Sequence, residues 1–354
     1  MPAACVGGRW ATGLLEVTSD LAALDTSGRW AIALPYTGSP VLARFAAWSD
    51  APPAGLDGRW RGPAVGVWST SLDQSAYVFA VEATRSAIAR GTVYQANICR
   101  VMSASLPDPA ASDVAGLFEL LRDGNPAPYA GFLRLPEQGV HIASASPELF
   151  LAVTATPEGR VVRSGPIKGT GRTAADLTDK DVAENIMIVD LVRNDLSRVS
   201  RTGTVTVPTL LEVQEHPGLV HLVSYVEGDL VEGTGWADLV DAAFPPGSVT
   251  GAPKYSALRL IEGLEREERS YYCGAFGWVD ADTGEAELAV AIRTFWVDSG
   301  TLKFGTGAGI TWGSDAASEW RETELKASRL VEIAGRTWPG QADSPTQSWQ
   351  ASAP

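Results

Sequence analysis

The order in which strands and helices are predicted constrains this chain most strongly. Short apolar runs broken by Gly and Pro indicate strands in residues 1–65, a hairpin in 139–164 and a meander of strands at 273–279, 286–297 and 301–305. Because strands and helices occur in groups rather than in alternation, we predict an α+β fold and not a doubly wound parallel sheet. Apolar residues at helical spacing predict helices at 72–90, 111–122, 178–196, 252–265 and 316–334.

The composition narrows the classes of partner and compartment. The 354 residues carry 28 basic and 42 acidic side chains, a net charge of −14, without a block of Lys and Arg, so nucleic acid is not expected to bind. Three cysteines without close spacing favour neither a disulfide framework nor a zinc site and fit a reducing, cytoplasmic compartment. Neither a signal peptide nor a membrane-spanning run of about 18 apolar residues is found.

Acidic residues interrupt the apolar faces of two predicted helices. On a helical wheel, Glu184 shares a face with Met187, Ile188 and Leu191. An acid in such a stripe is costly unless something pairs with it. It either reaches solvent or an arginine such as Arg193 at the helix edge, or it serves a ligand.

The last helix shows the same pattern. Glu319, Glu322 and Lys326 lie on the face that Leu330 and Ile333 mark as buried. The plain alternative is an ion pair between Glu322 and Lys326 on a solvated face. Carboxylates from two interior helices are also the ligands that a hard cation such as Mg²⁺ takes.

Three glycine-rich segments are candidates for anion binding or catalysis. Residues 245–254 open a helix, so free N–H groups and Lys254 could receive a carboxylate or phosphate, or the segment is only a tight loop. Residues 305–309 allow a ligand to approach the backbone closely. In residues 165–171, Lys168 lies between turn-forming residues and is either an ordinary surface lysine or a nucleophile. Residues 51–64 are predicted to be a linker or surface loop.

Nine short segments, taken in order, resemble the chorismate-utilising enzyme family. Any one of them is a weak signal, but together they cover residues 84–330 in a consistent order. The resemblance implies one large α+β domain of packed antiparallel β-sheets flanked by helices, with the active site in a cleft between them. The segments are 91–97, 144–148, 166–170, 183–195, 221–224, 244–254, 291–294, 307–310 and 319–326.

Lys168 directs the resemblance to one branch of the family. The Pro-Ile-Lys-Gly-Thr segment around it is similar to aminodeoxychorismate synthases, whereas anthranilate synthases usually have a small residue there. Gln95 matches the position where isochorismate and salicylate synthases carry a water-activating lysine. This branch implies conversion of chorismate and ammonia to 4-amino-4-deoxychorismate, for p-aminobenzoate and folate or a related metabolite. Lys168 would add at C2 of chorismate, and Glu148 would protonate the departing C4 hydroxyl.

The resemblance also implies a binding set. Glu184 and Glu322 match ligands of Mg²⁺, and Glu319 lies beside them. Arg293 matches the residue that holds the enolpyruvyl carboxylate. His221 matches a histidine near the leaving hydroxyl, although a buried structural histidine would satisfy the sequence equally. The further expected substrate contacts are Gln95, Thr170, Gly307, Ala308, Gly309 and Lys326.

The chain departs from typical family members at its ends. Residues 1–75 are expected to form a shortened β-rich part of the same fold, 76–338 the chorismate-binding catalytic region and 339–354 a disordered tail. No glutaminase nucleophile elbow is found, which implies a separate glutamine amidotransferase subunit that supplies ammonia. The alternatives are an anthranilate or aminodeoxyisochorismate synthase, and a non-catalytic chorismate-binding subunit.

Overall fold

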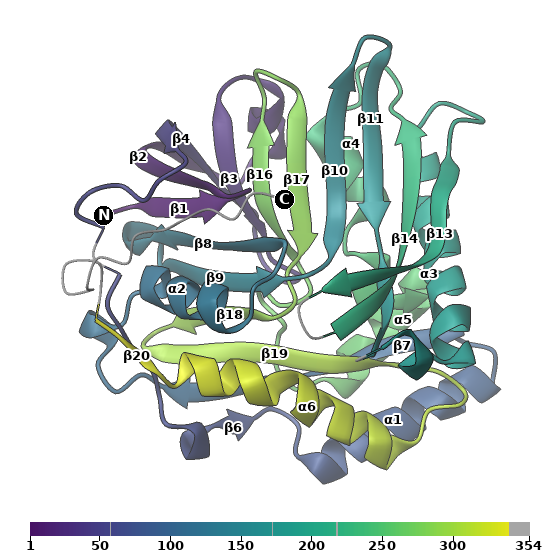
Figure 1. Cartoon of the computed structure of the whole chain (residues 1–354). Coiled ribbons are helices and arrows are strands. Elements are labelled where there is room, and N and C mark those ends of the chain that lie inside the picture. The colour runs from purple at the N-terminus through teal and green to yellow at the C-terminus, as the bar shows by residue number, and fades with distance from the viewer. Residues whose placement is uncertain (57, 172, 217–218, 340–354) are drawn as a thin grey trace.

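A computed structural model describes residues 1–56, 58–171, 173–216 and 219–339, and the predicted tail 340–354 lies outside the described residues. One sheet of eighteen strands dominates it, and all its strand pairs within the described residues are antiparallel. The sheet has two halves, because β2 (Arg9–Thr18) pairs with β4 (Val41–Ser49) and links them. The predicted α+β fold with packed antiparallel sheets is therefore confirmed (Figure 1).

The first half begins at β4, and most of its strands stand upright in Figure 1. From β4 it continues through β3, β16, β17, β10, β11 and β14, which pairs with both β12 and β13. Its strand bounds are β3 Arg29–Leu34, β10 Leu149–Thr156, β11 Gly159–Gly165, β12 Ile167–Gly171, β13 Thr206–His216, β14 Leu219–Asp229, β16 Ala275–Asp280 and β17 Glu285–Val290.

The second half begins at β2 and runs across the view in Figure 1. From β2 it continues through β1, β8, β9, β18, β19 and β7, and β7 also pairs with β6 and β15. Its strand bounds are β1 Ala3–Val6, β6 Ser69–Thr70, β7 Gln95–Ser105, β8 Tyr129–Leu135, β9 Val140–Ser146, β15 Gly251–Ala252, β18 Thr294–Asp298 and β19 Thr301–Ile310. A separate two-stranded sheet joins β5 Trp60–Arg61 to β20 Thr337–Trp338.

The helices cover the outer faces of the two halves. Helix α3 packs against β14, and its Ile188, Val192 and Leu196 belong to the largest apolar cluster. Helix α6 packs against β19 and buries Leu330 and Ile333, as its spacing predicted. No helix in the described part of the chain combines the length and apolar character that a membrane crossing requires. The helix bounds are α1 Gln74–Ala89, α2 Val114–Gly124, α3 Asp179–Ser197, α4 Trp236–Ala243, α5 Lys254–Leu264 and α6 Ala316–Ala334.

Two predicted elements differ from the structure. The run 286–297 is not one strand, because the chain turns between β17 and β18, where Arg293 has a φ of +52°. Residues 51–64 are not only a surface loop. They include β5, whose Trp60 is buried and donates a hydrogen bond from Nε1 to the Ala334 carbonyl oxygen at 2.8 Å. This contact ties the loop to the end of α6.

Candidate active site

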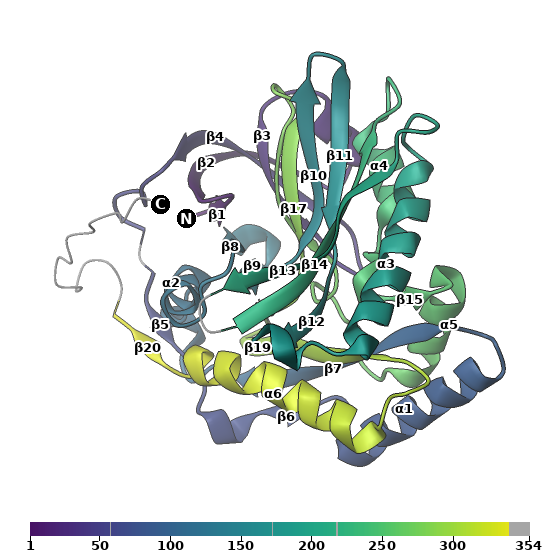
Figure 2. The same cartoon turned by 45° about the vertical axis from the view of Figure 1, so that its right-hand side comes forward.

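The segments that carry the predicted site residues meet beside the starts of α3 and α6. Figure 2 shows β12, β19 and these two helices converging there. Strand β12 supplies Lys168, the turn after β9 supplies Glu148, and the loop before β15 supplies Ser248. These residues come from distant parts of the chain, so the long-range pairing of the sheet builds the site.

Glu148 is buried in a polar setting with one open position. Burial raises the pKa of its carboxyl, while the Ser248 hydroxyl, the Lys168 ammonium and the Ile167 backbone N–H act in the opposite direction. Its Oε1 has no hydrogen-bond partner among the described residues. A buried carboxyl with a raised pKa and a free oxygen is suited to give a proton to a ligand.

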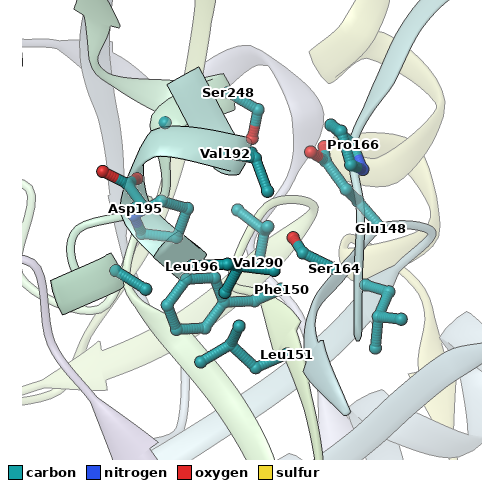
Figure 3. A pocket seen from close by; sticks show the side chains of 14 residues that line it. Glu148, Phe150, Leu151, Ser164, Pro166, Val192, Asp195, Leu196, Ser248 and Val290 are labelled. Atoms are coloured by element: carbon teal, nitrogen blue, oxygen red, sulfur yellow. The ribbon is translucent and has the colours of Figure 1, made fainter. Parts of the chain in front are cut away.

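A cavity behind Glu148 explains why the carboxyl is poorly solvated. Glu148 and Ser248 lie at one end of this cavity in Figure 3. Apolar side chains, including Phe150, Val192 and Leu196, form much of the remaining wall. Apolar surroundings disfavour the charged form of a carboxyl, which accounts for the direction of the shift.

Lys168 is held by the same loop that holds Glu148. Its Nζ donates a hydrogen bond to the Ser248 backbone carbonyl at 3.0 Å. The next residue, Gly169, has a φ of +80°, and a Cβ there would approach the Cβ of Asp181 in α3 to 2.9 Å. Only glycine fits this turn without strain. Lys168 is thus fixed between the loop and α3 rather than free on the surface.

Strand β19 brings its glycines to Lys168. A Cβ on Gly309 would collide with Gln95 Nε2 and lie 3.6 Å from Lys168 Nζ. The Gly307 carbonyl accepts a hydrogen bond from Lys326 Nζ at 3.2 Å. Gln95 is buried, and its Oε1 has no partner among the described residues. The open backbone of β19 and the free amide oxygen leave polar groups for a ligand next to Lys168.

Three further predicted contacts are placed less directly. The Ala308 side chain packs in an apolar cluster with Ile98 and Ile310, which leaves its backbone for the predicted contact. His221 is buried on β14 and pairs through its backbone with Thr170 of β12. The side chain of Thr170 lies outside the described part of the structure. A ligand contact by His221 or Thr170 stays a prediction.

The Arg293 guanidinium is partly buried and lies near Glu148. Among the described residues its guanidinium makes no hydrogen bond or ion pair, although its backbone carbonyl accepts from Ala145 N–H at 3.0 Å. Burial lowers the pKa of Arg293, and the nearby Glu148 acts in the opposite direction. A partly buried, unpaired guanidinium is suited to bidentate binding of a carboxylate.

The carboxylates of α3 and α6 face one another across a lysine. Lys180 Nζ donates to Glu319 Oε1 at 3.0 Å and lies 3.6 Å from Glu184 Oε1. Glu319 is 3% exposed, and its Oε2 has no hydrogen-bond partner among the described residues. Glu184 Oε1 likewise accepts no hydrogen bond within them, although it lies in ion-pair range of Lys180. The predicted alternative that Glu184 meets Arg193 is wrong, because Arg193 pairs with Asp190 at 3.0 Å.

Glu322 is more open than its helical face suggested. Its side chain is 46% exposed and pairs with Lys326 at 2.6 Å, the i,i+4 ion pair that the sequence left as an alternative. Partial burial acts to raise the pKa of Glu322, but Lys326, Lys180 and Lys168 together outweigh it, and the pKa is lowered. No three His, Cys, Asp or Glu side chains in the described ranges form a ready-made metal site. The donor chemistry nevertheless fits Mg²⁺, since unpartnered carboxylate oxygens remain on two helices.

The predicted anion-binding role of Lys254 is wrong. Its Nζ donates to Asp195 Oδ2 at 2.7 Å and to the Ala243 carbonyl at 3.0 Å, so its charge is already neutralised. Lys254 instead anchors the loop that carries Ser248. Sequence reasoning missed Ser248, which touches both Glu148 and Lys168, although it stands inside the recognised segment 244–254. It also missed Lys180, which gives no signal beyond a position four residues before Glu184.

Comparisons with known proteins identify the family of this chain. The profile of a family described as chorismate binding enzyme matches residues 49–332. Anthranilate synthase component 1 of Streptomyces coelicolor is 38% identical over 281 residues, which cover 76% of this chain and 53% of the relative. Aminodeoxychorismate synthase component 1 of Escherichia coli is 35% identical over 277 residues, which cover 75% and 59%. The match spans little more than half the length of these relatives.

Solved structures share the fold. Anthranilate synthase component I of Streptococcus pneumoniae aligns with a TM-score of 0.73 at 24% identity, covering 88% of this chain and 84% of the other. MenF, the menaquinone-specific isochorismate synthase of Escherichia coli, aligns with a TM-score of 0.77 at 17% identity, covering 95% and 89%. These likenesses show a common architecture, and the family profile covers most of the chain. The chain therefore belongs to the chorismate-binding enzyme family.

Proposed function

We propose that this chain converts chorismate and ammonia to 4-amino-4-deoxychorismate through a covalent adduct on Lys168. The relatives do not separate this reaction from anthranilate formation, since both names occur at 35–38% identity. The observation that supports it is that Ser248 contacts both groups. Its backbone carbonyl accepts a hydrogen bond from Lys168 Nζ at 3.0 Å, and its hydroxyl is hydrogen-bonded to the Glu148 carboxyl. A nucleophile and an acid are thereby kept at one place.

In the proposed reaction an amino group replaces the hydroxyl at C4, through an intermediate in which Lys168 is bonded to C2. After the Lys168 ammonium gives up a proton to solvent, its amine adds at C2 of the ring. Both ring double bonds shift by one position toward C4, and the C4–O bond breaks. Glu148 gives its proton to the departing oxygen, which leaves as water. Ammonia then adds at C4, both double bonds shift back and the bond between C2 and Lys168 breaks. Glu148 takes back a proton from the new ammonium group at C4. Two displacements through the conjugated ring replace one difficult substitution, which is the usual benefit of covalent catalysis.

Recognition of the substrate is assigned to charged and backbone groups around this pair. We propose that Arg293 binds the enolpyruvyl carboxylate, because its guanidinium has no partner within the described residues. Glu184, Glu319 and Glu322 would hold Mg²⁺. When bound, the ion would neutralise the ring carboxylate and polarise the ring. We propose that the backbone of Gly307 and Gly309 contacts a carboxylate of the substrate, with Gln95 and Lys168 beside Gly309.

Ammonia is proposed to come from a separate glutamine amidotransferase subunit. The relatives are named component 1, which implies a second component in those enzymes. We propose that this chain and its partner subunit are soluble and cytoplasmic. In an assay, free ammonia should replace the partner subunit.

The test has two stages. The purified chain is first incubated with chorismate and Mg²⁺ without ammonia, and intact mass spectrometry should show an adduct of chorismate minus water on the peptide that contains Lys168. Ammonium is then added at alkaline pH, and the adduct should disappear as 4-amino-4-deoxychorismate forms.

Two controls make the result decisive. Lys168→Ala should lose the adduct and most of the amination, whereas Lys303→Ala, a lysine paired with Glu267 at 3.0 Å, should keep both. Anthranilate, isochorismate or salicylate as the product would overturn the proposed reaction within the family. Bound chorismate without turnover, even with a glutaminase added, would indicate a non-catalytic binding subunit.

A further inference from the structure

Lys180 stands where a cation is least expected in a helix. It lies in the first turn of α3, whose N-cap Thr178 and Asp181 form a capping box. The positive end of the helix dipole disfavours a lysine there. The carboxylates of Glu184 and Glu319 offset this cost, since Lys180 Nζ lies 3.6 and 3.0 Å from them.

The same ammonium is the counterion that Glu319 needs in this structure. Glu319 is almost fully buried, and a buried carboxylate without a partner is strongly destabilising. Lys180 satisfies only one of its oxygens, because Oε2 remains without a partner among the described residues. Within those residues, this is also the only ion pair that joins α3 to α6.

The Lys180 ammonium is able to leave its ion pair with Glu319. Its side chain is 44% exposed, so the ammonium can rotate into water without unpacking α3. Glu319 cannot follow it, because its side chain is only 3% exposed. A divalent cation that binds Glu184 and Glu319 must therefore take the place of this ammonium.

We propose that Lys180 is an exchangeable counter-cation, which pairs with Glu319 and Glu184 when no metal is bound and is released to solvent when Mg²⁺ binds. This inference rests on the magnesium site of the proposed function. It assigns Lys180 a positioning role: it keeps α3 and α6 together before the metal arrives, and it sets a threshold for metal binding by competition.

The first test measures the release itself in the wild-type protein. The chain is treated briefly with an amine-acetylating reagent in excess EDTA or in saturating Mg²⁺, and peptide mass spectrometry gives the acetylation rate of each lysine. Lys180 should react severalfold faster with Mg²⁺, while Lys303, whose ion pairs with Glu267 and Asp298 involve no site residue, should not change. An equal or slower rate at Lys180 would overturn the exchange.

The second test measures the competition. Free Mn²⁺, followed by its electron paramagnetic resonance signal, serves as the metal probe. Lys180→Met should bind Mn²⁺ about fivefold more tightly than wild type, which corresponds to about 1 kcal/mol. Lys303→Met removes the same charge elsewhere and should stay within twofold of wild type. Lys180→Gln repeats the measurement if the methionine variant does not fold.

The outcomes separate the two proposals. If wild type binds Mn²⁺, Glu319→Gln abolishes binding, and Lys180→Met binds no more tightly than Lys303→Met, the exchange is wrong while the metal site stands. If wild type shows no saturable binding that depends on Glu319, both the exchange and the magnesium site are wrong. The covalent role of Lys168 is unaffected by either result.

Discussion

Replacing Lys254 by Met should destabilise the protein and slow its reaction together. The Asp195 carboxylate is 8% exposed and the Lys254 side chain 17%, and their charges meet at 2.7 Å. Removing one partner of a buried pair typically costs 3–5 kcal/mol. Because water reaches part of Lys254, we expect the lower end, about 3 kcal/mol. With about 2.1 cal/mol/K of unfolding entropy per residue, a chain of 354 residues should show a fall in Tm of about 4 °C.

The loss should depend on pH. Burial raises the pKa of Asp195, and Lys254 acts in the opposite direction, so removal of the lysine raises that pKa further. A carboxyl whose pKa is raised by folding stabilises the fold below its unfolded pKa and loses this contribution as the pH rises through the folded value. The penalty of Lys254→Met should therefore be largest near pH 7 and shrink as the pH falls toward 4.

Urea unfolding followed by tryptophan fluorescence at both pH values measures this effect. Lys303→Met is the matched control, because its pairs with Glu267 and Asp298 are partly exposed and should contribute at most about 1 kcal/mol. Turnover should also fall in Lys254→Met, since the anchored loop carries Ser248. A stability equal to that of the control, or a penalty independent of pH, would refute the reasoning.

Three other substitutions test single roles in the site. Glu148→Gln should reduce turnover about 10²- to 10⁴-fold without lowering Tm. Wild-type turnover should fall as the pH rises through the raised pKa of Glu148, and this fall should be absent in the variant. Unchanged turnover would remove the acid role. Arg293→Met should raise KM for chorismate about tenfold or more with a small effect on kcat, because a charged hydrogen bond is worth roughly 1.5–3 kcal/mol; normal substrate affinity would argue against it. Gly309→Ala should lose kcat/KM while urea unfolding changes little, because the added methyl meets the Gln95 amide beside Lys168; full activity would show that the space is not used.

Local patterns predicted five of the six described helices, all except α4, and the identity of the central residues. Helix α6 has the bounds that its apolar spacing indicated, and Leu330 and Ile333 are buried as expected. Lys168 and Glu148 stand in short segments that the resemblance identified, and the structure brings them to one loop. The helix bounds and the identity of these short segments depend on neighbours in sequence, which is why they could be predicted from the sequence.

Features that depend on distant partners could not be predicted in this way. Lys254 resembled an anion-binding lysine until Asp195, 59 residues away, was found beside it. The turn at Arg293 gave no glycine signal because a non-glycine residue adopts the positive φ. Glu322 shares a helical face with Glu319, yet its side chain is 46% exposed while that of Glu319 is 3% exposed, a difference set by the elements packed around α6 and not by the helical spacing.

The sheet that turns back on itself through β2 and β4 also bears on how the chain folds during synthesis. Strand β3 pairs with β16, and Leu34 and Ala275 are about 240 residues apart in sequence. At roughly 5–20 residues per second, a ribosome needs about 10–50 s to deliver that partner. Until then the edge of β3 that faces away from β4 has no strand to pair with. The pairing of β3 with β16 is also slow, because it closes a large loop. Strand β3 thus leaves the ribosome long before its partner β16 and is among the last strands to be completed.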